Sequence, residues 1–224
     1  MLSSESITLA VHQPTGKILH IDQALNGLAC ECICLQCEER FEAIQGKKRR
    51  KHFRHYSNTN CGGGLETALH QLAKQILMES REISLPRYGK VIYQNPISEK
   101  SFKEIIPDVS VELIDGTQVF FEVYHKHKIE SKKELFFKTG QHKSIEIDMK
   151  NCPVESYREI QDFVINQTTN KRIIFWELPS NPSSQNTEGS YVVAKLIAYL
   201  PILLIALRIL FPRQFKTLWR SIFS

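Results

Sequence analysis

The 224-residue sequence has no long apolar run at its N-terminus. Met1 to Ala10 is short, carries Glu5 and has no apolar core, which argues against a cleavable secretory signal. The chain also has little net charge outside its C-terminus. Five of the 29 lysines and arginines follow Tyr191, and no aspartate or glutamate does. The remaining 24 basic residues are matched by 24 acidic ones. We therefore expect a neutral main body that begins in the cytoplasm.

The composition is that of a globular protein. Hydrophobic residues make up 42% of the chain, enough for the core of one ordinary domain plus a small module. The stretch from Pro179 to Gly189 is rich in serine, asparagine and proline, which predicts a linker. We therefore divide the chain into a module over residues 1–62, a core over 63–178, a linker over 179–190 and a tail over 191–224.

Four of the six cysteines crowd into the segment from Cys30 to Cys37, with histidines downstream. This clustering favours a metal site over a disulfide framework. Cys34 and Cys37 are separated by two residues, the spacing of a zinc knuckle. His55 and Cys61 follow at a sequence separation that suits tetrahedral zinc. Such a site is closed and structural, and it stabilises a module too small for its own core. The competing ligands are Cys30, Cys32 and His52, and the alternative to zinc is a set of reduced buried thiols.

A basic run lies between the predicted zinc ligands. Its six basic residues are Lys47, Lys48, Arg49, Arg50, Lys51 and Arg54. Such a run can hold phosphates, and Phe53 beside it would be available to stack on a base. We therefore expect contact with nucleic acid, the alternative being a solvated turn.

The stretch from Ile105 to Lys133 reads as a strand, a turn at Asp115-Gly116 and a second strand. Asp108 opens the first strand and Glu122 lies in the second, so we expect their carboxylates close in space. A two-residue loop would pair Asp108 with Val123 and separate the carboxylates, so a shared face requires an odd-length loop or a bulge. Two close carboxylates usually hold a cation or a proton, and their oxygens suit Mg²⁺ or Mn²⁺. In the alternative, Glu122 faces solvent and Asp108 is only a turn residue.

The segments around this hairpin alternate between helical and strand patterns. Leu65 to Ser80 has apolar residues at helical spacing, beside a polar stripe of Glu66, His70 and Lys74. That stripe also suits an ordinary amphipathic helix with charge pairing. The other expected elements are a hairpin over 7–21, strands over 90–94, 144–149 and 172–176, and helices over 129–139 and 154–166. The alternation predicts an α/β layer fold.

These residues resemble a known nuclease signature. Pro107-Asp108 followed by Glu122-Val123-Tyr124 is similar to the PD-(D/E)XK motif. The downstream residues that resemble the CoiA-like competence proteins of that superfamily are His127, Glu130, Lys133 and the IEID segment at 145–148. The similarity extends from the N-terminal strands to about Trp176. It implies a restriction-endonuclease-like core, a central mixed sheet flanked by helices, and Mg²⁺- or Mn²⁺-dependent hydrolysis of phosphodiester bonds, with DNA as the substrate.

The resemblance also implies roles for individual residues, and it supports the choice of zinc ligands. The signature lysine belongs at position 124, where this chain has Tyr124, so either another lysine orients the attacking water or the site is inactive. Lys126 shares the strand face of Glu122, but Lys133 matches the CoiA-like pattern and is the lysine we favour. The implied catalytic residues are Asp108 and Glu122 as Mg²⁺ ligands, Glu66 and His70 from the helix, His127 and Lys133.

The sequence of the tail is compatible with more than one kind of membrane association. Val192 to Phe211 is twenty residues long, enough to cross a bilayer, but it contains Lys195, Pro201 and Arg208. A crossing that keeps the downstream basic residues inside would put the body outside, in conflict with reduced thiols and a nucleic-acid substrate. We therefore expect either an in-plane membrane helix or a crossing that disobeys the charge rule. The alternative is a helix buried against a second copy or a partner protein.

Taken together, the sequence predicts a zinc-stabilised, metal-dependent nuclease tethered by its tail to the cytoplasmic side of the membrane, or otherwise cytoplasmic. The main rival is an inactive nuclease-derived module that binds nucleic acid or recruits a partner. A third possibility is a membrane-anchored structural protein with a zinc knuckle, which would show no salt-dependent binding to DNA.

Overall fold

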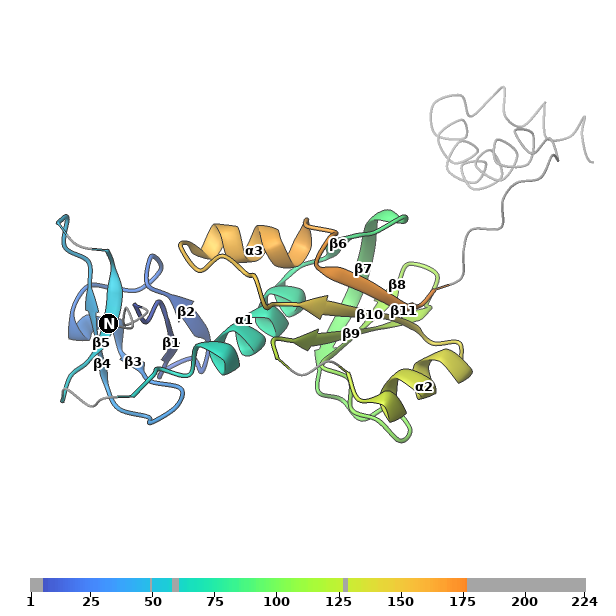
Figure 1. The fold of residues 1–224 in the computed structure, drawn as a ribbon, viewed down its shortest axis with the longest axis horizontal. Helices are drawn as coiled ribbons and strands as arrows, with labels where there is room; N and C mark the ends of the chain where they lie inside the picture. The colour runs from blue at the N-terminus through green and yellow to red at the C-terminus, as the bar shows by residue number, and fades with distance from the viewer. Residues whose placement is uncertain (1–5, 49, 58–60, 127–128, 177–224) are drawn as a thin grey trace, which may run out of the picture. The chain divides into compact units, whose positions relative to one another are not determined.

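A computed structural model describes residues 6–48, 50–57, 61–126 and 129–176 (Figure 1). The described residues belong to one compact unit, Met1–Glu177. Within them, no helix is long and apolar enough to span a membrane. The expectations for the linker at 179–190 and the membrane-associating tail at 191–224 fall outside the described residues.

The N-terminal module is built from short strands (Figure 1). A three-stranded sheet has the order β2-β1-β3, and β4 pairs with β5 as a separate ribbon. The bounds are β1 (Leu9–His12), β2 (Ile18–His20), η1 (Leu28–Cys30), β3 (Cys32–Ile33), β4 (Phe41–Ile44) and β5 (His52–His55). The predicted hairpin at 7–21 is confirmed by the antiparallel pairing of β1 with β2. Phe41 and Phe53 stack at 5.6 Å between ring centroids in the module's small core.

The core is a mixed α/β arrangement around a six-stranded sheet of order β11-β10-β9-β8-β7-β6. The strands are β6 (Glu82–Leu85), β7 (Gly89–Ser98), β8 (Val109–Leu113), β9 (Gln118–Tyr124), β10 (Lys143–Asp148) and β11 (Lys171–Phe175). Only β9 and β10 are parallel among these neighbours. A parallel pair needs a crossover between its strands, and α2 (Ser131–Thr139) lies in that connection. The mixed sheet follows directly from this one crossover.

Helices cover both faces of the sheet (Figure 1). α1 (Leu65–Glu79) and α3 (Tyr157–Ile165) share the main apolar cluster with inward residues of β7 to β10. This confirms the predicted helix at 65–80. On the other face, Phe137 of α2 stacks on Phe120 of β9 at 5.5 Å between ring centroids.

The hairpin of β8 and β9 has the odd-length loop that a shared carboxylate face requires. Its loop is Ile114 to Gly116, closed by hydrogen bonds from Leu113 N–H to Thr117 O (2.9 Å) and from Gly116 N–H to Leu113 O (3.0 Å). Gly116 has a φ of 80°, the left-handed conformation that glycine adopts readily at the end of such a loop. In the resulting register Val109 pairs with Phe121, so the preceding Asp108 comes opposite Glu122.

The module is tied to the helices of the core by polar contacts. Gln75 of α1 accepts a hydrogen bond from the backbone N–H of Ile18 at 2.9 Å. The ring of His20 is fully buried, and its Nε2 lies 3.1 Å from the carbonyl oxygen of Val154. Backbone and buried polar groups therefore find hydrogen-bond partners across this boundary, and the module packs against α1 and the segment before α3.

Candidate functional sites: a cysteine–histidine cluster and a carboxylate pocket

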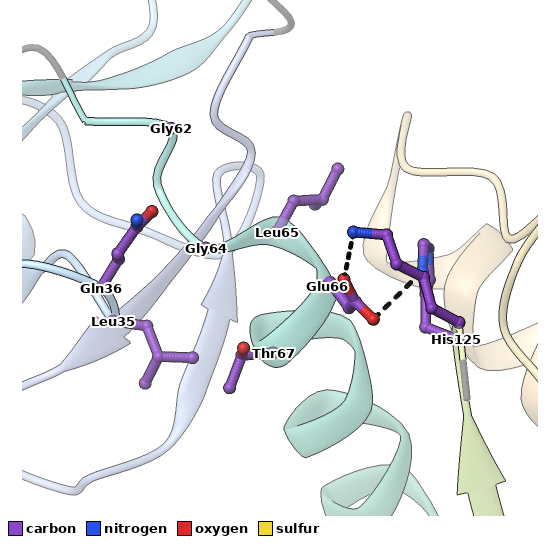
Figure 2. A pocket seen from close by; sticks show the side chains of 9 residues that line it. Leu35, Gln36, Gly62, Gly64, Leu65, Glu66, Thr67 and His125 are labelled. Carbon is purple, nitrogen blue, oxygen red and sulfur yellow. Dashed lines mark ion pairs between the residues drawn. The ribbon is translucent and has the colours of Figure 1, made fainter. Parts of the chain in front are cut away.

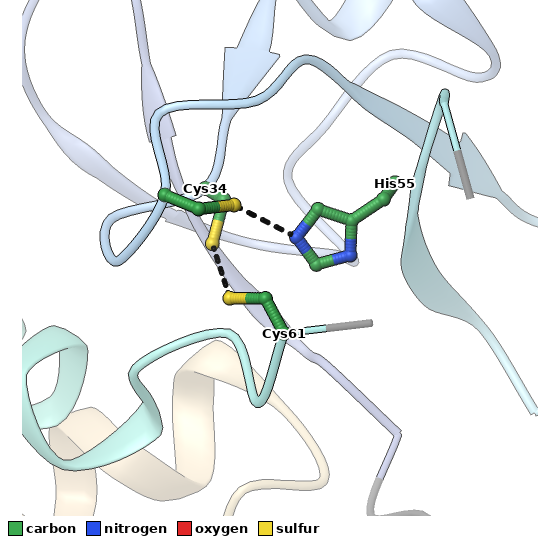
Figure 3. Close-up of side chains that lie close together, drawn as sticks. Cys34, His55 and Cys61 are labelled. Carbon is green, nitrogen blue, oxygen red and sulfur yellow. Dashed lines mark hydrogen bonds between the residues drawn. The ribbon is translucent and has the colours of Figure 1, made fainter. Parts of the chain in front are cut away.

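The cysteine–histidine cluster consists of Cys34, Cys37, His55 and Cys61 (Figure 3). Cys34 and Cys37 flank the turn after β3, His55 ends β5, and Cys61 precedes α1. One ligand atom from each residue lies within 4.8 Å of the other three. The four residues with the predicted zinc spacing are therefore brought together by the fold.

The distances within this cluster fit tetrahedral zinc. The Sγ atoms of Cys34 and Cys61 are 3.6 Å apart, and Cys37 Sγ lies 3.3 Å from His55 Nε2. Zinc–sulfur bonds of about 2.3 Å in tetrahedral geometry place two sulfurs about 3.8 Å apart. Three thiolates and one imidazole are also a donor set typical of structural zinc. The cluster can therefore hold a structural zinc ion.

The backbone around the cluster favours charged sulfur. Gln36 N–H points to Cys34 Sγ and Gly63 N–H to Cys61 Sγ, each at 3.4 Å. Burial raises the pKa of the Cys34 thiol to about 11, whereas the Gly63 N–H lowers the pKa of Cys61. A cation among the sulfurs would offset the cost of burying Cys34 as a thiolate.

The competing ligands have other partners. Cys30 Sγ and Cys32 Sγ donate to the carbonyl oxygens of Phe41 (3.5 Å) and Cys30 (3.1 Å). His52 Nδ1 lies 3.0 Å from Arg50 O. These three residues thus stay outside the cluster, where the two cysteines act as small buried core residues.

Asp108 is held at the mouth of the second site, a pocket beside β8 and β9. Its Oδ2 accepts a hydrogen bond from Val123 N–H at 2.8 Å and lies 3.3 Å from His70 Nε2. Burial alone would raise the pKa of Asp108, but the contacts with His70 and Val123 outweigh it and hold the pKa below its usual value. Asp108 is therefore a charged carboxylate at neutral pH.

Glu122 is the buried partner of Asp108, with 8% of its side chain exposed. Lys133 Nζ, from α2, lies 2.6 Å from Glu122 Oε2 and 2.7 Å from Ile106 O. Glu122 Oε1 is buried without a hydrogen-bond partner. Burial raises the pKa of Glu122 to about 8, although Lys133 acts in the opposite direction. A cation or a proton would stabilise a buried carboxylate that has one oxygen without a hydrogen-bond partner.

The pocket has a volume of about 860 Å³ and is lined by Asp108, Glu122 and His70 as well as Lys133. Its lining also includes the carboxylate of Glu146, which is the register partner of Glu122 on β10. Glu146 was not among the predicted site residues. Glu146 alternates with apolar residues in β10 as Glu122 does in β9, and this pattern could have indicated it. The pattern is informative only once the pairing of the two strands is known.

Tyr124 stands where the nuclease signature has lysine, and its hydroxyl donates to Asp148 Oδ2 at 2.7 Å. Two lysines were candidates to replace it. Lys133 reaches Glu122, whereas Lys126 Nζ lies 2.6 Å from Glu66 Oε2. The geometry thus favours Lys133 as the lysine of the carboxylate pocket.

Glu66 lines a separate pocket of about 600 Å³ at the start of α1, with Leu35 and Gln36 on one side and His125 on the other (Figure 2). Besides Lys126, it faces His125, whose Nδ1 is 3.9 Å from Glu66 Oε1. The predicted polar stripe of α1 is therefore divided: His70 contacts Asp108, Glu66 lies at the neighbouring pocket, and Lys74 pairs with Glu99 at 2.6 Å.

The predicted nucleic-acid contacts lie around the ribbon of β4 and β5. Lys47, Lys48 and Lys51 are exposed. Two further members of the run form ion pairs, Arg50 with Glu155 at 3.4 Å and Arg54 with Glu42 at 2.6 Å. Arg49 and the predicted catalytic residue His127 lie outside the described residues. The expected stacking role of Phe53 is wrong, because its ring is buried in the module core.

The carboxylate pocket does not form a tight ligand group of this kind. Among the described residues, only the cysteine–histidine cluster brings three or more potential ligand atoms so close together. The pocket therefore brings Asp108 and Glu122 together without a complete protein cage around them. That arrangement differs in kind from the cluster, where four ligands converge.

Comparison with known proteins adds no relative to this picture. No family model matches the chain, and searches of curated proteins and of solved structures find no match either.

Proposed function

We propose that this protein is a Mg²⁺- or Mn²⁺-dependent nuclease, with Asp108, Glu122 and Lys133 at its catalytic centre and DNA as its substrate. The observation that carries the proposal is the pairing of Asp108 with Glu122 at one pocket, where Glu122 keeps a buried oxygen without a partner. DNA enters through the resemblance to PD-(D/E)XK nucleases of the CoiA-like type. A mixed sheet flanked by helices agrees with the fold that this resemblance implies.

The donor set of the pocket suits Mg²⁺. This ion usually takes one or two carboxylates, keeps several waters and completes its shell with substrate phosphate, so a complete protein cage is not required. Asp108 and Glu122 are the residues that would hold it. When bound, the ion would polarise the scissile phosphate and lower the pKa of the attacking water.

The other side chains of the pocket have supporting roles in this proposal. Lys133 supplies a positive charge beside Glu122, where it can stabilise developing negative charge or orient water. His70 fixes the orientation of Asp108 through its contact with Oδ2. His127 keeps its expected role at the phosphate. Glu66 lies at the neighbouring pocket beside Lys126 and has no role in the proposed centre.

The remaining parts of the chain complete the proposal. Zinc in the cysteine–histidine cluster would stabilise the module that carries the basic run. The exposed lysines of that run, Lys47, Lys48 and Lys51, can hold DNA phosphates, with Arg50 and Arg54 beside them. The tail would associate the nuclease with the cytoplasmic side of the membrane or with a partner.

The decisive experiment measures cleavage of single- and double-stranded DNA by the full-length, zinc-loaded protein. Mg²⁺ or Mn²⁺ is added to buffer freed of divalent ions, because EDTA would also attack the zinc cluster. We expect metal-dependent cleavage that falls by roughly 100-fold or more in Asp108→Asn and Glu122→Gln. Glu112→Gln is the matched control, since Glu112 is a carboxylate of β8 that hydrogen-bonds Asn95 and does not line the pocket.

A second candidate is a nuclease-derived module that binds DNA without cutting it. Two observations favour it: Lys133 already occupies one oxygen of Glu122, and Tyr124 stands in place of the signature lysine. The same experiment separates the two functions. DNA binding without cleavage under either metal would support the binding module and overturn the nuclease.

A further inference from the structure

The helix that carries Lys133 is held to the sheet by little apolar surface. Phe137 is the buried residue of the nine in α2, and Leu135 is 60% exposed. Helices in proteins usually gain most of their stability from packing an apolar face. Phe136 is only partly buried against the same cluster as Phe137, so the position of α2, and with it the reach of Lys133, depends on polar contacts as well.

Arg172 of β11 supplies such a contact. Its guanidinium donates from Nη1 and Nη2 to the two carboxylate oxygens of Glu134 on α2, at 3.0 Å and 2.9 Å. Its Nε donates at 2.7 Å to Glu146 Oε2 on β10. Because the guanidinium is a rigid planar fork, these three bonds fix the helix relative to two strands at once.

Glu146 connects this arrangement to the start of α2. It is only 1% exposed, and its second oxygen, Oε1, accepts a hydrogen bond from Ile129 N–H at 2.9 Å. Ile129 lies just before α2, while Glu146 is the register partner of Glu122. One buried carboxylate therefore contacts both Arg172 and the entry to the helix.

Lys133 and Glu134 are neighbours in α2, so their two contacts with the sheet depend on the same helix position. We infer that Glu146, Arg172 and Glu134 form a positioning network that sets the place of α2 and so holds Lys133 against Glu122. The inference deepens the proposed nuclease function and rests on it. In this network Arg172 and Glu134 lie outside the pocket lining and act through Lys133, whereas Glu146 lines the pocket and connects them to the start of α2.

The network differs from an ordinary surface ion pair. Isolated exposed pairs contribute little, but bidentate arginine–carboxylate pairs joined into networks are the exception. Removing Arg172 would also leave Glu146 as a buried charge without its cation, which is strongly unfavourable. We therefore expect substitutions here to move the helix rather than only to remove a surface ion pair.

The test compares Arg172→Gln and Glu134→Gln with Lys138→Gln in the full-length protein. Lys138 is the matched control because it pairs with Glu134 at 2.6 Å but is 51% exposed and belongs to α2 itself. In both network variants we expect the cleavage rate to fall by about 10-fold, the size seen when a residue that orients a catalytic group is removed. Lys138→Gln should cleave like the wild type.

A second readout does not require cleavage. The side-chain signals of Lys133 are followed by carbon-13 NMR and are assigned from their absence in Lys133→Met. Lys133 Nζ contacts Glu122 Oε2 and Ile106 O, so a displaced Lys133 should shift these signals toward those of the exposed lysines in both network variants and leave them unchanged in Lys138→Gln.

Unchanged Lys133 signals in Arg172→Gln and Glu134→Gln would overturn the network. If Arg172→Gln does not fold, Glu134→Gln decides the question alone, because its substitution removes no buried charge. A wild type that shows no cleavage would overturn the nuclease proposal, while the Lys133 NMR signals would still decide whether the network positions Lys133.

Discussion

Two groups of side chains in the described part of the chain differ in almost every physical respect: the cysteine–histidine cluster, which can hold structural zinc, and the carboxylate pocket, which we propose binds Mg²⁺ or Mn²⁺. In the cysteine–histidine cluster, three sulfur ligands and one imidazole converge within 4.8 Å. In the carboxylate pocket, two hard ligands, Asp108 and Glu122, share a space of about 860 Å³ with Lys133. One site is closed and complete, as structural zinc sites are, and the other is open and incomplete.

The difference teaches where each site obtains its stability. The cluster gains from each ligand and would stabilise the small module around it. The pocket instead lowers the stability of the fold at neutral pH, because Glu122 is buried with one oxygen unpaired and burial raises its pKa to about 8. Such a cost is typical of groups kept for function rather than for folding. The predictions below test this contrast.

The largest effect is expected at the cluster. Cys34→Ser should abolish zinc binding and unfold the module, because zinc binding to such sites is worth on the order of 10 kcal/mol. Elemental analysis and thermal unfolding measure both effects. Cys30→Ser is the control, since Cys30 lies in the same module core but outside the cluster. Equal zinc content in the two variants would contradict the ligand assignment.

The next effect distinguishes the two candidate lysines. Lys133→Met should lower metal-dependent cleavage by roughly 100-fold, because it removes the positive charge beside Glu122. Lys126→Met should have little effect, since Lys126 pairs with Glu66 outside the pocket. The comparison uses single-turnover cleavage rates. A larger decrease in Lys126→Met would show that Lys133 is not the catalytic lysine.

A smaller effect concerns stability and pH. Burial raises the pKa of Glu122 from 4.5 to about 8, so the folded protein keeps a proton that the unfolded chain releases. The stability that this protonated form contributes is present below pH 4.5 and is lost as pH rises toward 8. Glu122→Gln avoids that loss.

Without added Mg²⁺ or Mn²⁺, Glu122→Gln should therefore gain thermal stability over the wild type as pH rises from 5 to 8, by roughly 3 °C or more in a chain of this size. Thermal unfolding followed by circular dichroism measures the difference. Glu112→Gln provides the control on the same hairpin. A difference that does not change with pH would show that Glu122 is not held protonated by burial.

The smallest effect is expected at the basic run. Replacing Lys47, Lys48 and Lys51 with glutamine should weaken DNA binding at every sequence and reduce the salt dependence of binding by about one unit for each phosphate that is no longer neutralised. Fluorescence anisotropy at several salt concentrations measures both. Lys90→Gln, at an exposed lysine of β7, should leave the salt dependence unchanged. Equal slopes in all variants would remove the basic run from the binding surface.

Much of the fold follows from local patterns in the sequence. α1 was predicted almost to the residue because its apolar spacing is regular over four turns. The strand at 82–85 was missed, although Ile83 and Leu85 alternate with Glu82 and Ser84, because it is short and directly follows a helix. Short strands are stabilised by their neighbours rather than by their own sequence.

The two sites differ in how far the sequence predicts them. The zinc ligands follow from spacing, since all four lie within one small module. The pairing of Asp108 with Glu122 depended on the length of one loop, which composition alone did not fix. Glu146 and Arg172 were not predicted, because their roles arise only when β10 and β11 take their places beside β9. Pairings between distant segments are the part that local patterns do not contain.

The most direct test of the contrast between the two sites is a Mn²⁺ titration of the zinc-loaded, full-length protein at pH 8.5, followed by electron paramagnetic resonance. The wild type should bind about one Mn²⁺ per chain, and Glu122→Gln should lose that binding while it keeps its zinc. Equal Mn²⁺ binding by the two proteins would contradict the claim that the carboxylate pocket is a second, functional metal site.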